Sequence, residues 1–300
     1  MTTSALISIV MPTYNGTKYL DQAIESCLDQ TYPHWELVVV DDASTDNTQQ
    51  RLKEWQERDS RIRVIRHENN KGLPGALNTG IQHMDGAYFT WLSDDDLLRA
   101  HTLKTMLQFL EDNPEIELVY TDYSEVDENN NFIRRRYVEA PELLGIANPI
   151  GVCHLRKREV FDKVGIYAED LFLAEDLEFW IRAFMKCKVS ILREDLFLYR
   201  QHQASLTTSQ KKRVYPVHGE ILDRHIDNMH WLDADQRAWA YFRLAKRAME
   251  YKDWQHVKEY TQKALAQSPT FIVKKAIQKA LGEDANTEYF STEATQHDKQ

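Results

Sequence analysis

Three adjacent carboxylates, Asp94 to Asp96, directly follow an apolar run that is typical of a β-strand. Carboxylates this close repel one another, so they are stable only if they stay hydrated or if a positive group neutralises them. A hard divalent cation is the usual partner, and Mg²⁺ is commonly held by one or two carboxylates together with phosphate oxygens of a substrate. The triplet therefore indicates a metal-assisted site for a nucleotide diphosphate.

Two further polar clusters, Thr13-Tyr14-Asn15 and Asp41-Asp42, also follow runs that read as strands. A single acidic pair at such a place is equally typical of a helix cap or a solvated turn. Three polar clusters at the carboxyl ends of strands instead favour a ligand site, because open α/β sheets bind ligands there. Neither a Walker A loop nor a G-x-G-x-x-G sequence occurs, so the phosphates are not expected to lie in a glycine-rich cradle.

The order of apolar patterns predicts an alternating α/β chain. Short β-branched or aromatic runs alternate with segments of helical spacing, and this alternation predicts a mostly parallel sheet with helices on both faces. The expected strands are 5–11, 35–40, 62–65, 87–92 and 117–123, with Pro12 ending the first. The expected helices are 17–29, 46–58, 76–83 and about 102–111, with Asp46 a candidate N-cap.

Composition narrows the class of partner. The chain has 300 residues and a formal net charge of −10, which argues against nucleic acid or an anionic membrane surface as the main partner. The basic runs 134–136, 156–158 and 211–213 are each interpreted as solvated faces. Three separated cysteines suggest a reducing compartment, and no export signal or membrane-spanning run is apparent. A cytoplasmic location is expected.

At this point the motifs match a known family. The segment "VMPTYNGTKYLDQAIESCLDQTYPHWELVVVDDASTDNT" (10–48) resembles the N-terminal signature of family 2 glycosyltransferases. "NNKGLPGALNTGI" and "GAYFTWLSDDDLL" continue the match in the right order, followed by "AEDLEFWIRA" (174–183) and "LYRQHQASLTT" (198–208). The resemblance covers roughly residues 5 to 208 and implies a GT-A-type, Rossmann-like α/β fold.

The resemblance also implies which residues bind a nucleotide sugar. The Pro-Thr-Tyr-Asn loop and the second carboxylate after the second strand correspond to the base- and ribose-binding elements of the family. At Leu77 many relatives carry an arginine that helps to hold the donor, and Lys71 or Arg200 are the candidates to replace it. The implied donor-binding set is Pro12, Tyr14, Asn15, Asp42, Lys71, Asp94 and Arg200.

The family's metal-binding DxD motif falls on residues 93 to 95. Its first position is Ser93, which leaves Asp95 as the aligned metal carboxylate and puts the strength of metal binding in question. The histidine of the closing Arg-x-His element, His202, corresponds to a residue that contacts the metal or diphosphate in relatives. The implied cofactor is Mn²⁺ or Mg²⁺.

By the same resemblance Asp176 is the catalytic base, and Glu175 orients it or binds the acceptor. The implied route is a single displacement with inversion and without a covalent intermediate. A carboxylate suffices as base because the electrophilic, oxocarbenium-like anomeric carbon acidifies the attacking hydroxyl. Glu175 and Asp176 could also cap the helix that follows them, and the two roles are compatible.

Composition becomes helical after residue 208. Residues 238–269 form two blocks of helical spacing that resemble one tetratricopeptide repeat, with Ala245, Tyr260, Ala264 and Pro269 at the expected places. The expected domains are therefore a GT-A domain at 1–208, a helical region at 209–282 and a disordered tail at 283–300. The helices could be a cap or a module that binds a protein partner.

The sequence thus predicts a metal-dependent, inverting hexosyl-type glycosyltransferase that uses a nucleotide sugar, with UDP the commonest nucleotide in relatives. Its acceptor is expected to be a glycan or lipid-linked hydroxyl in cell-surface polysaccharide or glycolipid assembly, in the cytoplasm or at the inner membrane face. A noncatalytic sugar-nucleotide-binding scaffold that docks partners through the C-terminal helices is the main alternative. A nucleotidyltransferase is a weaker one, because "PTYNGTKYL" lacks the expected glycine-rich basic loop.

Overall fold

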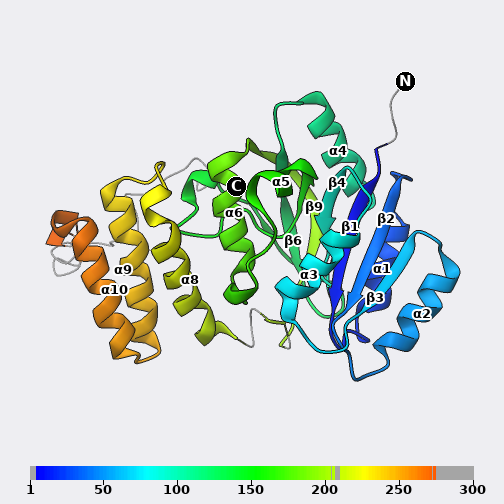
Figure 1. Cartoon of the computed structure of the whole chain (residues 1–300), viewed down its shortest axis with the longest axis horizontal. Helices are drawn as coiled ribbons and strands as arrows, with labels where there is room; N and C mark the ends of the chain where they lie inside the picture. Colours follow the sequence, from blue (N-terminus) through cyan, green and yellow to red (C-terminus); the bar gives the residue numbers. More distant parts are fainter. Residues whose placement is uncertain (1–4, 204, 207–209, 272, 275–300) are drawn as a thin grey trace. The chain divides into compact units, whose positions relative to one another are not determined.

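The computed structural model describes residues 5–203, 205–206, 210–271 and 273–274 of the chain. The chain divides into two compact units (Figure 1). The first, called here the sheet unit, comprises Met1–Val138 and Ile150–Ser209. The second, the helical unit, comprises Glu139–Pro149 and Gln210–Gln300. Every predicted site residue lies in the sheet unit.

The sheet unit contains a nine-stranded sheet in the described part of the chain, with the order β3-β2-β1-β4-β8-β6-β9-β5 and with β7 paired to β6. Its strands are β1 Ile7–Thr13, β2 Trp35–Asp41, β3 Ile62–Arg66, β4 Tyr88–Trp91, β5 Leu97–Leu98, β6 Leu118–Val126, β7 Phe132–Arg136, β8 His154–Lys157 and β9 Val189–Arg200. Its α-helices are α1 Leu20–Leu28, α2 Thr48–Arg58, α3 Gly72–His83, α4 Thr102–Asp112, α5 Glu159–Val164 and α6 Glu175–Lys186, and a short 3₁₀ turn covers Glu169–Leu171. The predicted α/β class is confirmed.

The two halves of this sheet are paired differently. Strands β3, β2, β1 and β4 are parallel, as the alternation predicts, whereas β8 runs antiparallel to both β4 and β6. Strand β7 is antiparallel to β6 because only five residues connect them, whereas a parallel neighbour needs a crossover of a dozen or more residues.

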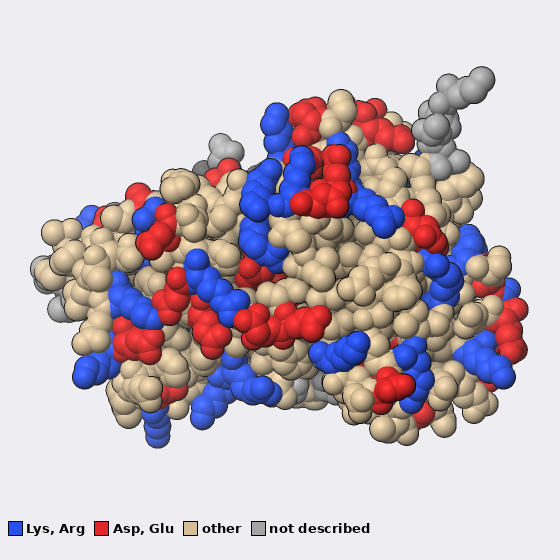
Figure 2. Space-filling model, in the orientation of Figure 1, with Lys and Arg blue, Asp and Glu red and all other residues tan. Residues whose placement is uncertain are grey.

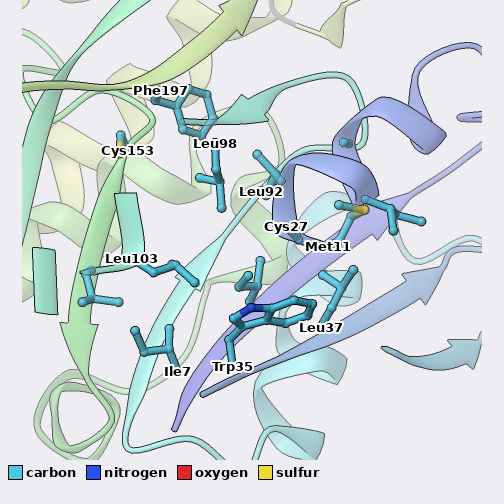
Figure 3. Close-up of a cluster of buried hydrophobic side chains, with 14 of the residues drawn as sticks. Ile7, Met11, Cys27, Trp35, Leu37, Leu92, Leu98, Leu103, Cys153 and Phe197 are labelled. Carbon is cyan, nitrogen blue, oxygen red and sulfur yellow. The ribbon is translucent and has the colours of Figure 1, made fainter. Parts of the chain in front are cut away.

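Side-chain alternation along β1 distributes the core over both faces of the sheet. Ile7, Ile9 and Met11 join a buried cluster with α1, α2 and α4, part of which is drawn in Figure 3. Val10, on the opposite face, packs so closely on α3 that a Cβ at Gly80 would lie 2.3 Å from it. Helices thus cover both faces, and the carboxyl ends of the parallel strands stay available for a site.

The structure corrects the predicted end of the first strand. Strand β1 continues through Pro12 to Thr13. The carbonyl of Val10 accepts a hydrogen bond from Leu92 on the β4 side, and the carbonyl of Thr13 accepts one from Asp42 on the β2 side. Pro12 therefore turns its nitrogen toward the β4 side, where β4 has already ended at Trp91, so the missing N–H costs no ladder bond.

The helical unit contains α8 Lys211–His225, α9 Ala234–Glu250 and α10 Trp254–Gln267, with short 3₁₀ turns at Pro141–Leu143 and Ile226–Asn228. A capping box between Asp233 and Gln236 starts α9, and the Asp253 side chain caps α10. The two expected helical blocks are thus present, while their resemblance to a tetratricopeptide repeat stays a prediction. The predicted tail at 283–300 lies outside the described residues.

Two surface properties follow from the described residues. None of their helices combines the length and the apolar character that crossing a bilayer requires. On the face drawn in Figure 2, acidic and basic side chains are interspersed, so this face offers no extended area of one charge.

Candidate active site

The acidic triplet lies in the short segment that links β4 to β5 and meets the loop after β1. The Thr13 hydroxyl donates a hydrogen bond to the Asp94 carboxylate. A Cβ at Gly16 would lie 1.9 Å from the same carboxylate, so only glycine allows the loop this close. The first and third predicted polar clusters are therefore in direct contact, as their position at one sheet edge led us to expect.

In the second cluster, the carboxylates of Asp41 and Asp42 already form hydrogen bonds and an ion pair with protein groups. Asp41 is buried, pairs with Arg66 and accepts a hydrogen bond from the backbone of Ser44 at 2.9 Å. The Asp42 carboxylate accepts bonds from the backbone N–H groups of Lys71 and Gly72, each at 2.8 Å. It also contacts His67 Nδ1 at 2.7 Å. These bonds fasten the loop between β3 and α3 to the end of β2.

In the Pro-Thr-Tyr-Asn loop the ring of Tyr14 is exposed, whereas the side-chain amide of Asn15 is hydrogen-bonded to protein groups. The Tyr14 side chain is 51% exposed, so a planar base could stack on it. Asn15, at a positive φ of 56°, accepts bonds from the backbone N–H groups of Thr45 and Asp46 at 2.8 and 3.3 Å. Asn15 thus ties its loop to the loop after β2, and the binding role predicted for it stays a prediction.

Asp95 and His202 meet across 107 residues of sequence. The Asp95 Oδ2 atom lies 2.8 Å from His202 Nε2, and both side chains are only partly buried. The ring of Tyr19 packs against the His202 ring, with the two ring centroids 5.2 Å apart. The two residues that the family resemblance implies as metal ligands are therefore neighbours.

The predicted donor-binding residue Arg200 is buried and already engaged. Its side chain donates to the Asp95 carbonyl at 2.7 Å and to Gln22 Oε1 at 3.0 Å, and its guanidinium stacks on Tyr19 at 4.3 Å. Its backbone N–H donates to Asp96 at 2.8 Å. Arg200 therefore holds the acidic segment in place in this structure, and no part of it is directed to solvent.

Leu77, at the position where many relatives carry an arginine, is also buried. Leu77 is 1% exposed on α3, so residue 77 adds no polar group to the surface of the site. Lys71, just before α3, has an exposed side chain whose ammonium group is free to reach a phosphate. Of the two predicted replacements for the arginine, Lys71 is the one that the structure leaves accessible.

Negative charge in the triplet is only partly compensated. Burial and the charge of Asp95 raise the pKa of Asp94 to about 7, and the same two causes raise the pKa of Asp96 well above its usual range. Raised pKa values mean that the folded chain destabilises these carboxylates in their charged form. A bound cation would remove that penalty.

The donor set fits a divalent cation that a diphosphate helps to hold. No group of three or more His, Cys, Asp or Glu side chains forms a complete metal site within the described ranges. Asp95 and His202 supply two ligand atoms 2.8 Å apart, close to the roughly 3 Å between neighbouring ligands of an octahedral Mg²⁺. The remaining positions would belong to phosphate oxygens and water.

The Glu175-Asp176 pair lies in the first turn of α6. Glu175 is buried, and its carboxylate accepts a hydrogen bond from the backbone of Leu173 at 2.9 Å. Burial, followed by the charge of Asp176, raises the pKa of Glu175 to about 8. Asp176 is only partly buried. The raised pKa favours the neutral form of Glu175 near pH 7.

The sequence reasoning missed the residues that support these groups. Tyr19 and Gln22 on or before α1, His67 after β3 and Glu128 after β6 hold the site residues through side-chain contacts. One signal was available for Glu128. Strand β6 extends to Val126 instead of the predicted residue 123, and a longer strand places Glu128 at the same carboxyl edge as the acidic clusters.

Comparison with known proteins identifies the class. The family described as "Glycosyl transferase family 2" matches residues 8–172, which is more than half of the chain. The chain therefore belongs to this family, and it is a glycosyltransferase that uses a nucleotide-sugar donor. The matched range contains β1 through α5 and all the acidic clusters except Glu175-Asp176.

Two curated relatives align with most of the chain. The "Putative teichuronic acid biosynthesis glycosyltransferase TuaG" of Bacillus subtilis is 27% identical over 250 residues, which cover 82% of this chain and 96% of the relative. The "UDP-Glc:alpha-D-GlcNAc-diphosphoundecaprenol beta-1,3-glucosyltransferase WfgD" of Escherichia coli is 28% identical over 256 residues, which cover 83% and 97%.

Two solved structures share the fold at low sequence identity. S. aureus TarS 1-349 in complex with UDP-GlcNAc superimposes with a TM-score of 0.61 at 16% identity, covering 95% of this chain and 94% of TarS. The mannosyltransferase PcManGT of Pyrobaculum calidifontis, in complex with GDP-Man and Mn²⁺, gives 0.56 at 18% identity, covering 98% and 79%. Both likenesses support the GT-A-type fold.

Proposed function

We propose that this chain transfers a single sugar, with inversion and with the help of a divalent cation, from a UDP-sugar to a hydroxyl of a lipid-linked glycan. The observation that carries the proposal is the contact between Asp95 and His202 beside the undercompensated Asp94 and Asp96. The UDP donor is supported by the WfgD relative and by the UDP-GlcNAc complex of TarS.

The donor would lie along the loops that follow β1, β2 and β4. The exposed Tyr14 ring offers a stacking surface for the base, and Lys71 offers a cation for the diphosphate. Asp94, which accepts a hydrogen bond from the Thr13 hydroxyl, would also accept one from the ribose. Asp95 and His202 would hold Mn²⁺ or Mg²⁺, which neutralises the diphosphate as the sugar–phosphate bond breaks.

Pro12, Asn15, Asp42 and Arg200 support this donor site in a different way. Their side chains or backbone positions hold the loops, and Asp42 and Arg200 each make three or more contacts with other protein groups. We therefore propose that these four residues position the donor loops. Only atoms that are not used in these bonds could contact the donor directly.

Asp176 is the proposed base. It takes the proton of the acceptor hydroxyl while that oxygen attacks the anomeric carbon from the face opposite the leaving UDP, so the configuration inverts in one step. The neutral Glu175 beside it keeps a second negative charge out of the acceptor side and can donate its carboxyl proton in a hydrogen bond to the acceptor. Buried carboxyls with raised pKa values are typical of such sites.

The lipid-linked acceptor and a role in cell-surface polysaccharide assembly are supported by the names of the two relatives. WfgD acts on a sugar-diphosphoundecaprenol, and TuaG is ascribed to teichuronic acid biosynthesis. Transfer of one sugar rather than polymerisation is favoured because the sequence lacks a Gln-x-x-Arg-Trp element.

The test has two steps. First, thermal melting of the purified chain is measured with UDP, GDP and dTDP, each with and without Mn²⁺, because a ligand that binds only the folded state raises the melting temperature. We expect a shift that is selective for UDP, needs the metal and disappears in Asp95→Ala. Asp112→Ala, which removes an exposed carboxylate at the end of α4, is the matched control.

Second, UDP release is measured with several UDP-sugars and a sugar-diphospholipid acceptor in detergent. Asp176→Asn should retain the thermal shift with UDP and lose turnover by about 10²–10⁴-fold, the usual contribution of a general base. If no nucleotide shifts the melting point under any metal condition, the donor-site assignment is wrong. A scaffold that docks partners through α9 and α10 would then be the better description.

A further inference from the structure

Strand β7 is an unusual edge. Every residue of Phe132–Arg136 is exposed, and among the described strands β7 pairs only with β6. The register shifts between Glu125 and Val126, so β7 carries one extra residue, Ile133, next to the turn that joins the two strands. Exposed edges invite association, and proteins usually shield them or use them.

Large apolar side chains gather on this edge. Phe132 is 66% exposed, Ile133 48% and Tyr137 48%, and these three belong to the ten large exposed hydrophobic residues of the described chain. Their spacing within six residues makes them a local patch rather than scattered surface residues. Exposed apolar side chains gathered in one segment are typical of an interaction site.

Arginines are interleaved with the apolar residues and exceed their acidic partners. Arg134 and Arg136 share one carboxylate, Glu125. Arg135 shares Asp122 with Arg193 of β9. Four guanidinium groups therefore face two carboxylates, and the side chains of the three β7 arginines are 37–59% exposed. A guanidinium has five N–H donors, so each retains donors for a further anion.

The patch borders the candidate active site. Phe132 lies opposite Val126, and Val126 lies opposite Arg200 on the next strand. Neighbouring strands are about 4.8 Å apart, so Phe132 is roughly 10 Å from Arg200, which holds the acidic segment. The turn between β6 and β7 reinforces this position, because Glu128 pairs with Lys18 beside the ring of Tyr19.

We infer that the surface formed by Phe132, Ile133, Arg134, Arg135, Arg136 and Tyr137, called here the β7 surface, docks on an anionic phospholipid bilayer. Aromatic rings and arginines with apolar stems are the side chains that suit the bilayer interface. The local excess of positive charge complements anionic headgroups, and it acts within a Debye length, where distant acidic residues are screened. A net charge of −10 for the whole chain is therefore compatible with this contact.

The inference rests on the proposed function in one respect, namely the lipid-linked acceptor. Such an acceptor presents its sugar hydroxyl at the level of the headgroups. Docking through the β7 surface places the neighbouring candidate site at that level, so the acceptor reaches the donor without leaving the membrane. The gain is a raised local concentration of acceptor, which is independent of the chemistry of transfer.

The test is flotation of the full chain with vesicles of phosphatidylcholine alone or with phosphatidylglycerol as a minor component. Wild type should float with the anionic vesicles and much less with the neutral ones. The double variant Phe132→Ser, Ile133→Ser should partition at least about tenfold less, because it removes two inserting apolar side chains. Arg135→Gln should partition about fivefold less, and Asp122 keeps its Arg193 and Val138 partners in that variant.

Trp254→Ser and Lys53→Gln are the matched controls, since Trp254 is 64% exposed on α10 and Lys53 is exposed on α2. Both should bind vesicles as wild type does. The inference is overturned if wild type does not float with anionic vesicles, if it floats equally with neutral ones, or if the double variant floats as well as wild type. Binding of UDP without vesicles is measured in parallel. If wild type does not bind UDP, the proposed function is refuted, whatever the result of the flotation assay.

Discussion

The two acidic regions of the sheet unit look alike in sequence but differ in what compensates them. Asp41 and Asp42 follow β2 and receive their hydrogen bonds from Arg66, His67 and nearby backbone N–H groups. Asp94 and Asp96 follow β4 and have raised pKa values because burial and Asp95 oppose their charge. A satisfied carboxylate stabilises a fold, whereas an undercompensated one is ready to take a cation.

The largest loss of activity is expected from a substitution in the acidic triplet, whose negative charge protein groups compensate only in part. Asp95→Ala removes one of the two side chains proposed to hold the cation, and turnover should fall by about 10²–10³-fold, as it does when one charge-stabilising group is lost. The melting temperature without ligand should stay close to that of Asp112→Ala. UDP release under saturating Mn²⁺ measures the first quantity and thermal melting the second. Turnover within a few-fold of wild type would place the metal elsewhere.

For Asp41 and Asp42, whose charges are compensated by protein groups, a substitution is expected to lower the stability of the fold. Asp42→Ala leaves the buried His67 ring and the Lys71 N–H group without their Asp42 partner, while the Gly72 N–H group keeps Asn70 Oδ1 at 3.0 Å. A buried group that loses its partner costs about 1–3 kcal/mol, and the part-buried Lys71 N–H group costs less, so the free energy of unfolding should fall by about 2–3 kcal/mol. Urea denaturation provides the measurement, with Asp85→Ala as the control because the Asp85 side chain is 70% exposed. Equal stability of the two variants would contradict a structural role for Asp42.

Glu175 offers a comparison that depends on pH. Its pKa is raised from 4.5 to about 8, first by burial and then by Asp176, so the folded chain binds this proton more tightly than the unfolded chain. Wild type should therefore lose stability relative to Glu175→Gln as the pH rises from 4.5 to about 8. The loss should reach about 1.4 kcal/mol per pH unit and level off above that range.

Thermal melts of wild type and Glu175→Gln over this pH interval measure the difference directly. Glutamine keeps an oxygen for the Leu173 N–H group, so the local hydrogen bond is preserved. A difference in melting temperature that stays constant with pH would show that Glu175 does not titrate as the structure indicates.

The smallest effect is expected for the support behind the metal site. Tyr19→Phe removes the 3.2 Å bond from the tyrosine hydroxyl to Glu128 and keeps the ring that packs on His202. A single partly exposed hydrogen bond contributes about 0.5–1.5 kcal/mol, so the Mn²⁺ concentration for half-maximal activity should rise by no more than about tenfold. Titration of turnover with Mn²⁺ tests this, with kcat at saturating metal as the internal control. A loss of kcat with unchanged metal affinity would mean that Tyr19 acts on another step.

Most of the parallel half of the fold could be predicted because its signals are local. Strand, helix and strand alternate at short range, so the apolar pattern of each segment is enough to place β1, β2, β3 and β4 in one parallel sheet. The other half of the sheet, which mixes antiparallel pairs with the parallel pair of β6 and β9, was not predictable in this way. The pairing of β8 between β4 and β6 joins segments more than 30 residues apart that carry no shared pattern.

The candidate site could be predicted in its members but not in their contacts. The ends of the strands and the motif order single out Asp94, Asp95, Asp176 and His202, and the structure brings Asp95 and His202 together. Nothing in the local sequence distinguishes Arg200, which is enclosed by Tyr19, Gln22 and the Asp95 carbonyl, from an arginine that faces a ligand.

The sequence by itself determined the class of the protein, because the order of the motifs and the chemistry of clustered carboxylates can be read without knowing the tertiary structure. Only the tertiary structure decided which charges are compensated. Compensation depends on atoms within a few ångströms of each carboxylate, and those atoms come from distant segments: His67 and Gly72 for Asp42, and His202, 107 residues away, for Asp95. Coulomb and desolvation energies follow distance in space, so two acidic clusters with similar sequences acquire different properties when the chain folds.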